Sequence, residues 1–499
     1  MSRRRLARNA AFSVVQVVLS AVAMVLMYRL LMQSLPIEAI GLWSLVVGSA
    51  SVARLTELGL GAGALRFIAA DIGAERPDRA AGIAGMAGFC VAALVGVLAL
   101  ISRPFLYHYL ELATPAAMHG AVSPLLDAAL ASVVLGAIAN VIFSAIDGCQ
   151  RMDLRAQVQI AASFVQLGAT WLVLPRYGLA GLGLAALAQA GFQLVFGAGI
   201  ALRLLGTPLR SYVAFDLGRL KQLFLYGGGL QISGLAQLLF EPLIKVLLTG
   251  FSGLALTGYF DMANRIMQQL RGVIVAAYGA LVPHIAARTG RGDLTPAQIR
   301  SIYSEACDLL LFIALPYFTG IAAALPLALT LWAGHFDAVF LAVALVQFGA
   351  WLVNVMITPA YLLFVALGRL RWNIASHVLI GAVTLVFGIG MGKLTGGPGV
   401  LAAGAGGLIV GSLVVLIAFH REYQQSFGVF FLRRRLPLAV LLLVSTVISV
   451  TIAMAGVTPN WPFLVGQPIA FGLAALALSW RDPQRAELTA ELWLLLRRS

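Results

Sequence analysis

The chain alternates between long apolar stretches and short polar gaps. A helix that crosses a bilayer needs about 20 mostly apolar residues, and fourteen stretches have about that length. None alternates in hydropathy over about ten residues, as a barrel strand would. We therefore predict an all-α polytopic membrane protein. The predicted spans lie near residues 10–33, 39–63, 82–102, 124–146, 155–174, 179–202, 223–249, 254–282, 306–331, 339–366, 373–392, 399–420, 436–456 and 463–480.

The basic residues are distributed unevenly over the polar gaps. Of the 34 Lys and Arg residues, 26 lie in every second gap, counting the two terminal segments, and the intervening gaps hold only Arg103, Arg176 and Lys393. Because cytoplasmic loops retain basic residues, this distribution predicts that both termini are cytoplasmic. The first apolar run continues past the cleavage-like Ala21-Val22-Ala23, so we expect an uncleaved first span.

Composition excludes a soluble protein. Mean hydropathy is +0.93, and only 11% of the residues are charged, whereas a water-facing surface needs far more charge. The net charge of +14 is spread over loops that would face an anionic leaflet, so we do not expect nucleic-acid binding. The gaps are too short to fold a soluble catalytic domain, so we expect no enzyme activity and no catalytic residue. Cys90, Cys149 and Cys307 have no metal-ligand spacing, and we expect no metal or cofactor.

Three short sequence matches indicate an internal repeat. Gly41-Leu42-Trp43 resembles Gly258-Tyr259-Phe260, and two further matches have offsets of 220 and 218 residues. Six spans separate the copies, which predicts two six-helix lobes related by a pseudo-two-fold axis along the membrane normal. Transporters built this way bind substrate between their lobes. The further matches are Gly148-Cys149-Gln150-Arg151 with Gly368-Arg369-Leu370-Arg371, and Gly181-Leu182-Gly183 with Gly399-Val400-Leu401. The predicted domains are an N-terminal lobe at 1–210, a C-terminal lobe at 211–425, and a C-terminal helix pair with a cytoplasmic tail at 426–499.

Eight charged residues lie four or more residues from the ends of the predicted spans. At such depth a charge usually faces a cavity or a charged partner. Six of them form pairs spaced to share one helix face: Arg54 with Glu57, Glu241 with Lys245, and Asp261 with Arg265. Five of the eight are positive, and a positive surplus suits phosphate, which arginine can bind in a bidentate way. The predicted substrate-binding residues are Arg54, Arg265, Arg271, Arg29 and Lys245. The predicted charge partners or coupling groups are Glu57, Asp261 and Glu241.

Four of these assignments have a structural alternative. Arg29 lies near the outer end of its span, where its side chain could extend to the interface. Glu241 and Lys245 could form a structural ion pair, and a cytoplasmic-side kink could expose Arg271. Four aromatic residues in these spans could line the cavity or belong to the interfacial belt, and the belt is the default assignment: Tyr28, Trp43, Tyr259 and Tyr278. Four histidines lie near span ends without forming a ligand-like cluster: His284, His335, His377 and His420.

Several segments resemble a known family. The chain is similar to Wzx-type O-antigen and exopolysaccharide flippases of the multidrug/oligosaccharidyl-lipid/polysaccharide (MOP) exporter superfamily. The resemblance implies two six-helix lobes with two further C-terminal helices, a cationic cavity to which Arg54 and Arg265 correspond, and location in the bacterial cytoplasmic (inner) membrane. It rests on Gly41-Leu42-Trp43, Glu57-Leu58-Gly59-Leu60-Gly61, Arg66, Tyr177–Gly181, Tyr226–Gly234, Gly258-Tyr259, Ala263-Asn264-Arg265 and Pro283.

The resemblance implies translocation of a polyprenyl-pyrophosphate-linked oligosaccharide by alternating access, for cell-surface polysaccharide export. The expected partners are that lipid-linked glycan, membrane lipids and the polysaccharide polymerase or export machinery. A lipid II flippase of the same superfamily remains an alternative. A multidrug or cation antiporter is a second, although its cationic substrates would favour a surplus of acids. A membrane glycosyltransferase or polymerase is a third, although it would need a large outer loop or a carboxylate-rich site.

Overall fold

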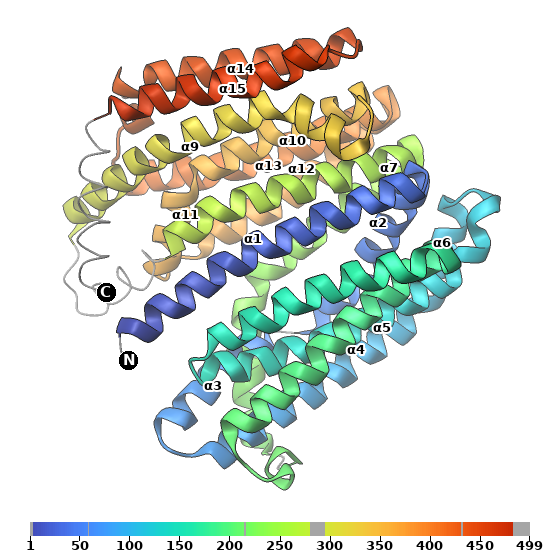
Figure 1. Cartoon of the computed structure of the whole chain (residues 1–499). Helices are drawn as coiled ribbons and strands as arrows, with labels where there is room; N and C mark the ends of the chain where they lie inside the picture. The colour runs from blue at the N-terminus through green and yellow to red at the C-terminus, as the bar shows by residue number, and fades with distance from the viewer. Residues whose placement is uncertain (1–2, 58, 214–215, 280–294, 431–432, 483–499) are drawn as a thin grey trace. The chain divides into compact units, whose positions relative to one another are not determined.

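The structure is a computed structural model that describes residues 3–57, 59–213, 216–279, 295–430 and 433–482. Within these ranges every regular element is helical (Figure 1), so the predicted all-α fold is confirmed. Three positions named above lie outside the described residues: Leu58, Pro283 and His284. So does the predicted cytoplasmic tail from residue 483 onwards.

The chain divides into two compact units, 1–261 and 262–499. The first contains α1 (Arg3–Ser34), α2 (Ile37–Ser51), η1 (Val52–Glu57), α3 (Leu60–Gly73), α4 (Pro77–Ala113), η2 (Ala116–Met118), α5 (His119–Gly148), α6 (Met152–Leu205), η3 (Leu209–Val213) and most of α7 (Leu217–Gly279). The second contains the end of α7, α9 (Pro296–Ala333), α10 (Ala338–Met356), α11 (Thr358–Ala366), α12 (Arg371–Thr395), α13 (Gly397–Glu422), η4 (Phe427–Phe430), η5 (Arg433–Arg435), α14 (Leu436–Ala455) and α15 (Trp461–Trp480).

Twelve helical segments in the described ranges are long and apolar enough to cross a membrane. Two of them, in α6 and α7, fold back on themselves at Gly178 and Gly253, where the backbone leaves helical geometry. Thr249 and Thr257 show the reversal in α7, because their hydroxyls are 2.9 Å apart although eight residues of straight helix would separate them by about 12 Å. Counting both arms of each hairpin gives fourteen spans, which agrees with the sequence.

The predicted internal repeat is visible in the backbone. Gly178 (φ 52°, ψ −132°) and Gly396 (φ 68°, ψ −145°) reverse the chain with similar, glycine-specific geometry, and they are 218 residues apart. Another repeat position shows the same offset. The amides of residues 149–151 bond to carbonyls 145, 147 and 146, and those of 367–369 bond to 363, 365 and 364. Gln150 therefore corresponds to Gly368, and the correct offset for this match is 218 rather than 220.

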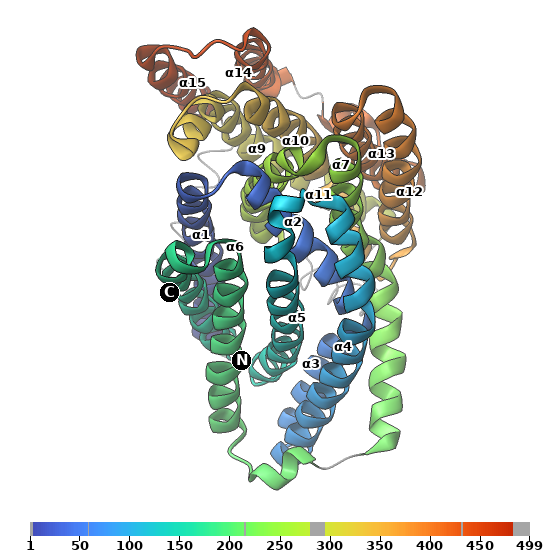
Figure 2. The same cartoon turned by 90° about the vertical axis from the view of Figure 1, so that its right-hand side faces the viewer.

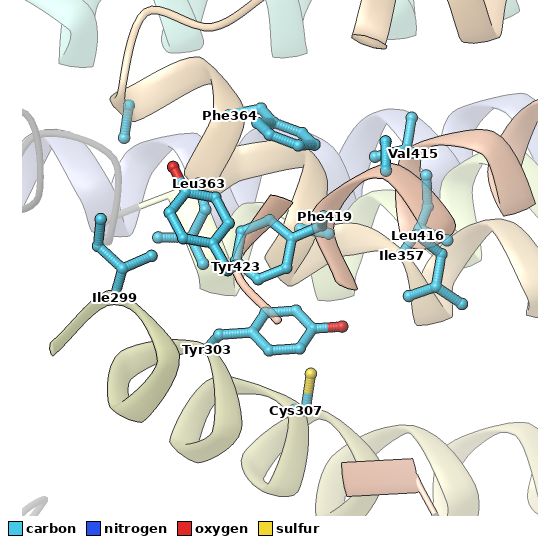
Figure 3. Packing of buried hydrophobic residues seen from close by; sticks show 13 residues of the cluster. Ile299, Tyr303, Cys307, Ile357, Leu363, Phe364, Val415, Leu416, Phe419 and Tyr423 are labelled. Atoms are coloured by element: carbon cyan, nitrogen blue, oxygen red, sulfur yellow. The ribbon is translucent and has the colours of Figure 1, made fainter. Parts of the chain in front are cut away.

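Each unit has its own apolar packing. In unit 1, α3 and α4 run beside α5 (Figure 2), and Phe143 and Ile146 of α5 pack on Val158 of α6. In unit 2, rings from α9, α11 and α13 pack together, with Tyr303, Phe364 and Phe419 buried (Figure 3). The α14 and α15 pair lies along α9 in Figure 1, as expected for a helix pair appended to a lobe.

A buried arginine connects this helix pair to α9. Arg435, just before α14, bonds to Asp308 of α9 at 3.0 Å and also pairs with Asp482, which follows α15. Arg435 is 2% exposed, and its guanidinium lies over the ring of Phe312. A buried arginine needs such compensation. The two carboxylates therefore tie both ends of the pair to the same helix.

Candidate functional site

The second predicted span is broken where its charged residues lie. Helix α2 passes at Val52 into the 3₁₀ segment η1, and α3 begins only at Leu60, after Gly59 in left-handed conformation. The expectation of one continuous helix over 39–63 is therefore wrong. Transporters commonly bind substrates and ions at such breaks, because unwound backbone at membrane depth occurs where it lines a cavity or is buried in protein.

Arg54 and Glu57 lie within this break. In a 3₁₀ helix, side chains three residues apart are eclipsed, and Arg54 Nε donates to Glu57 Oε1 at 2.7 Å. The side chains are 38% and 21% exposed. The pair predicted from the spacing is formed, and the guanidinium remains accessible.

Three further predicted charged residues, Glu241, Lys245 and Asp261, form a network within the α7 hairpin. Lys245 Nζ lies 2.7 Å from Glu241 Oε1 and 2.7 Å from Asp261 Oδ1. Tyr28 of α1 donates its hydroxyl hydrogen to Asp261 Oδ2 at 2.5 Å. Lys245 is 1% exposed and Asp261 is 0% exposed. Lys245 is thus flanked by two carboxylates, a geometry that favours the structural ion pair left open by the sequence.

The hairpin explains why Lys245 meets Asp261. Both residues are eight positions from Gly253, and the arms run antiparallel from that glycine, so positions equally distant from it face one another. A glycine of α2 also packs beside this network. A Cβ at Gly48 of α2 would lie 3.1 Å from Lys245 Cδ, so a larger residue there would crowd the lysine.

Arg271 of unit 2 is held by neutral partners. Its Nε donates to Asn354 Oδ1 at 2.8 Å, and its guanidinium lies 5.3 Å from the Trp351 ring centroid. Asn354 Nδ2 in turn donates to Ser412 Oγ at 2.9 Å. Among the described residues, no carboxylate forms an ion pair with Arg271. Its side chain is half-buried, and the arginine therefore keeps its positive charge uncompensated in its own unit.

The remaining predicted residues are placed as follows. Arg29 is exposed on α1, one position after Tyr28. Arg265 is half-buried on α7, next to the buried Asn264, whose Oδ1 accepts from Trp351 Nε1 at 3.0 Å. Arg29 and Arg54 lie in unit 1, whereas Arg265 and Arg271 lie in unit 2.

Three aromatic residues assigned to the interfacial belt are buried instead. Tyr28, Trp43 and Tyr278 are between 1% and 5% exposed. Tyr28 bonds to Asp261, and Tyr278 donates to the Ala306 carbonyl at 3.0 Å. The belt assignment is wrong for these three because tertiary contacts, which composition does not reveal, supply partners for their hydroxyls or cover their rings.

The neutral polar residues around Arg271 were not predicted from the sequence. Asn354, Trp351 and Ser412 lie in apolar spans and carry no charge that would distinguish them. Polar side chains inside membrane helices usually bond to another helix, so Asn354 could have been found by the same rule. No group of three or more metal-ligating residues is present among the described residues.

Two of three comparisons with known proteins found similar proteins. Residues 89–339, just over half of the chain, match a family described as "polysaccharide biosynthesis protein". No curated protein matches the chain. Among solved structures, a lipid II flippase, MurJ, in an inward closed conformation is 12% identical, with a TM-score of 0.68 over 94% of this chain and 97% of that chain.

Two further solved structures belong to the MOP superfamily. An inward-facing multidrug resistance MATE transporter is 17% identical, with a TM-score of 0.63 over 82% of this chain and 94% of that one. A transporter from Pyrococcus furiosus is 15% identical, with a TM-score of 0.55 over 83% and 96%. These likenesses show the fold and confirm the resemblance to the superfamily. The chain is a multi-pass membrane protein that belongs to the polysaccharide biosynthesis protein family and has the fold of the MOP exporters.

Proposed function

We propose that this protein is a flippase that moves a polyprenyl-pyrophosphate-linked oligosaccharide across the bacterial cytoplasmic membrane by alternating access. The family match to polysaccharide biosynthesis and the likeness to a lipid II flippase support the reaction class. Both termini are placed in the cytoplasm on the distribution of basic residues. The product would pass to the polymerase and export machinery of a surface polysaccharide.

The observation that carries the proposal is that Arg271 has only neutral side-chain partners among the described residues. A cation at membrane depth normally has a carboxylate partner or faces a water-filled cavity, and Arg271 is held by Asn354 and Trp351 instead. The bond through Nε leaves the two terminal nitrogens for a ligand. Two phosphate oxygens of a pyrophosphate can accept hydrogen bonds from these two nitrogens at once. We assign Arg271, with Arg265, Arg54 and Arg29, to the pyrophosphate.

Lys245 has a different place in this proposal. Its ammonium is flanked by two carboxylates and is 1% exposed, so a phosphate would have to displace Asp261 or Glu241 to reach it. We therefore assign Lys245, Glu241 and Asp261 to a charge network that fixes the α7 hairpin against α1. Glu57 keeps Arg54 oriented within the break after α2.

The test is export in a strain that lacks the native gene. Arg271→Ala and the double variant Arg54→Ala, Arg265→Ala are expected to abolish surface glycan and to leave lipid-linked repeat units trapped on the cytoplasmic side. Lys393→Ala, an exposed cation at the end of α12, is the matched control and should export normally. Normal export by the double variant, at unchanged abundance in the membrane, would refute the proposed site.

The trapped lipid also distinguishes the related substrate. If the deletion strain accumulates the peptidoglycan precursor lipid II rather than a lipid-linked glycan repeat unit, the protein is a lipid II flippase. Loss of drug efflux without either accumulation would favour an antiporter. The proposal of an oligosaccharide flippase requires accumulation of the glycan repeat unit.

A further inference from the structure

Two arginines pair with one carboxylate in unit 2, and a third arginine precedes that carboxylate in the chain. Glu422, the last residue of α13, accepts from Arg371 Nη2 at 3.0 Å and from Trp372 Nε1 at 3.1 Å. Arg369 Nη1 donates to its other oxygen. Arg421 precedes Glu422 and is exposed. The cluster therefore holds three positive charges against one negative charge.

A cavity of about 440 Å³ opens beside this cluster. One part of its lining is polar, with two arginines, Arg371 and Arg421, and one carboxylate, Glu422, beside the indole of Trp372, so its net charge is positive. The other part is apolar and is formed by Val414, Ile417 and Ala418 of α13. The cavity is thus amphipathic along the axis of α13, with the charges at the helix end and the apolar residues one or two turns further into the span.

An apolar face of α13 continues from the cavity. Val410, Leu413 and Ile417 are each between 38% and 40% exposed, and their spacing of three and four residues puts them on one side of the helix. An acyl chain lying on this face would reach the cavity with its headgroup at Arg371 and Arg421. The side chain of Arg371 is 69% exposed, so a phosphate can approach it without breaking its bond to Glu422.

We propose that this cavity binds an anionic phospholipid of the cytoplasmic leaflet, with the lipid phosphate between Arg371 and Arg421 and one acyl chain along α13. Basic pockets between membrane helices on the cytoplasmic side bind such headgroups. The site belongs to unit 2 alone and is separate from the residues assigned to the transported substrate. The assignment to the cytoplasmic leaflet rests on the topology given under the proposed function. The choice of an anionic lipid rests on the charges and the apolar residues that line the cavity.

Trp372 provides a direct probe, because bromine atoms on a lipid acyl chain quench a nearby indole. The purified protein is reconstituted with phosphatidylcholine that contains a small fraction of either dibrominated phosphatidylglycerol or dibrominated phosphatidylcholine. Subtracting the signal of Trp372→Phe isolates this tryptophan from the other seven. Trp372 is expected to be quenched several-fold more strongly by the anionic lipid. Equal quenching by the two brominated lipids would refute the site.

Variants test whether the arginines cause the preference for the anionic lipid. Each arginine removed should weaken binding of the anionic lipid about fivefold, since a basic residue near the surface is worth about 1 kcal/mol. Arg371→Ala, Arg421→Ala should therefore lose the preference. Arg203→Ala is the matched control, because Arg203 is exposed in the last turn of α6, 218 residues before Arg421, and it should retain the preference.

Two outcomes of the variant series would contradict the proposal: an unchanged preference in the double variant, or an equal loss in Arg203→Ala. If the double variant fails to fold, the comparison of lipids on the unaltered protein still decides. Inorganic phosphate, compared with sodium chloride at equal ionic strength, distinguishes a lipid from a soluble anion. Phosphate should relieve the quenching no more than chloride does, and specific relief would assign the site to a soluble phosphate.

Discussion

Lys245 and Asp261 form an ion pair inside the membrane-spanning part of unit 1, with Nζ and Oδ1 2.7 Å apart and neither side chain more than 1% exposed. They lie on opposite arms of the α7 hairpin. Tyr28 of α1 bonds to the second oxygen of Asp261. The network thus connects three helical segments through charges that cannot be solvated individually, which makes each partner depend on the others.

Removing the charge of Lys245 alone is therefore expected to destabilise the protein more than removing the charges of both Lys245 and Asp261. Lys245→Met leaves Asp261 buried without its counter-charge, and breaking a buried pair in this way costs about 3–5 kcal/mol. Lys245→Met, Asp261→Asn removes both charges and keeps an acceptor for Tyr28, so most of the stability should return. The measurement is unfolding of the purified protein in detergent. A single variant as stable as the double variant would contradict a tightly coupled pair.

Exchanging Glu241 and Lys245 tests whether the positive charge must lie at position 245, opposite Asp261. The i,i+4 pair alone would survive the exchange, because both charges remain on one helix face. In the structure, however, position 245 faces Asp261, and the exchange would bring two carboxylates together in a dry environment. We expect low abundance in the membrane, with recovery when Asp261→Asn is added. Normal abundance of the exchanged protein would show that the Asp261 contact contributes little.

The spans could be predicted from the sequence because hydropathy and helix length are local properties. The bilayer requires each crossing segment to satisfy its own backbone hydrogen bonds, so an apolar run of sufficient length is already a strong signal. Breaks were harder to predict. The break between α10 and α11 has a sequence signal, because Pro359 lies in the first turn of α11. No residue of Val52–Glu57 indicates a 3₁₀ segment, so the break after α2 is visible only in the structure.

Local spacing correctly predicted the pairing of Arg54 with Glu57 and of Glu241 with Lys245. It did not predict the contact of Asp261 with Lys245, which depends on the reversal at Gly253. Still less did it predict Tyr28, which is 233 residues from Asp261 in the chain. Periodicity along one helix contains no information on which other helix faces it, so these partners required the tertiary structure.

Gly396 is expected to be intolerant of a side chain. Its φ of 68° and ψ of −145° lie in a region that is essentially restricted to glycine, and a residue forced there costs about 1–3 kcal/mol. Gly396→Ala should lower the free energy of unfolding by that amount. Gly390→Ala in the same unit is the control, because Gly390 lies within α12 and a Cβ there meets no atom within 4 Å. Equal stability of the two variants would show that the turn relaxes.

Asn354 is expected to position Arg271 for its ligand. Asn354→Ala removes the acceptor of Arg271 Nε, and losing a hydrogen bond to a charged group costs about 1.5–3 kcal/mol, which corresponds to a reduction in export of roughly tenfold or more. Asn354→Asp should reduce export further, although it keeps an acceptor, because a carboxylate beside Arg271 would compete with the pyrophosphate. Export is measured as surface glycan at matched protein abundance.

Ser412→Ala is the control for this pair of variants. It removes the partner of Asn354 Nδ2 but leaves Arg271 bonded to the amide oxygen, so export should fall only slightly. The order Ser412→Ala, Asn354→Ala, Asn354→Asp, from mildest to most severe, follows from a guanidinium that must be oriented and must have no carboxylate partner of its own. If Asn354→Asp exported as well as the unaltered protein, a carboxylate beside Arg271 would not compete with the substrate, and the assignment of Arg271 to the pyrophosphate would fail.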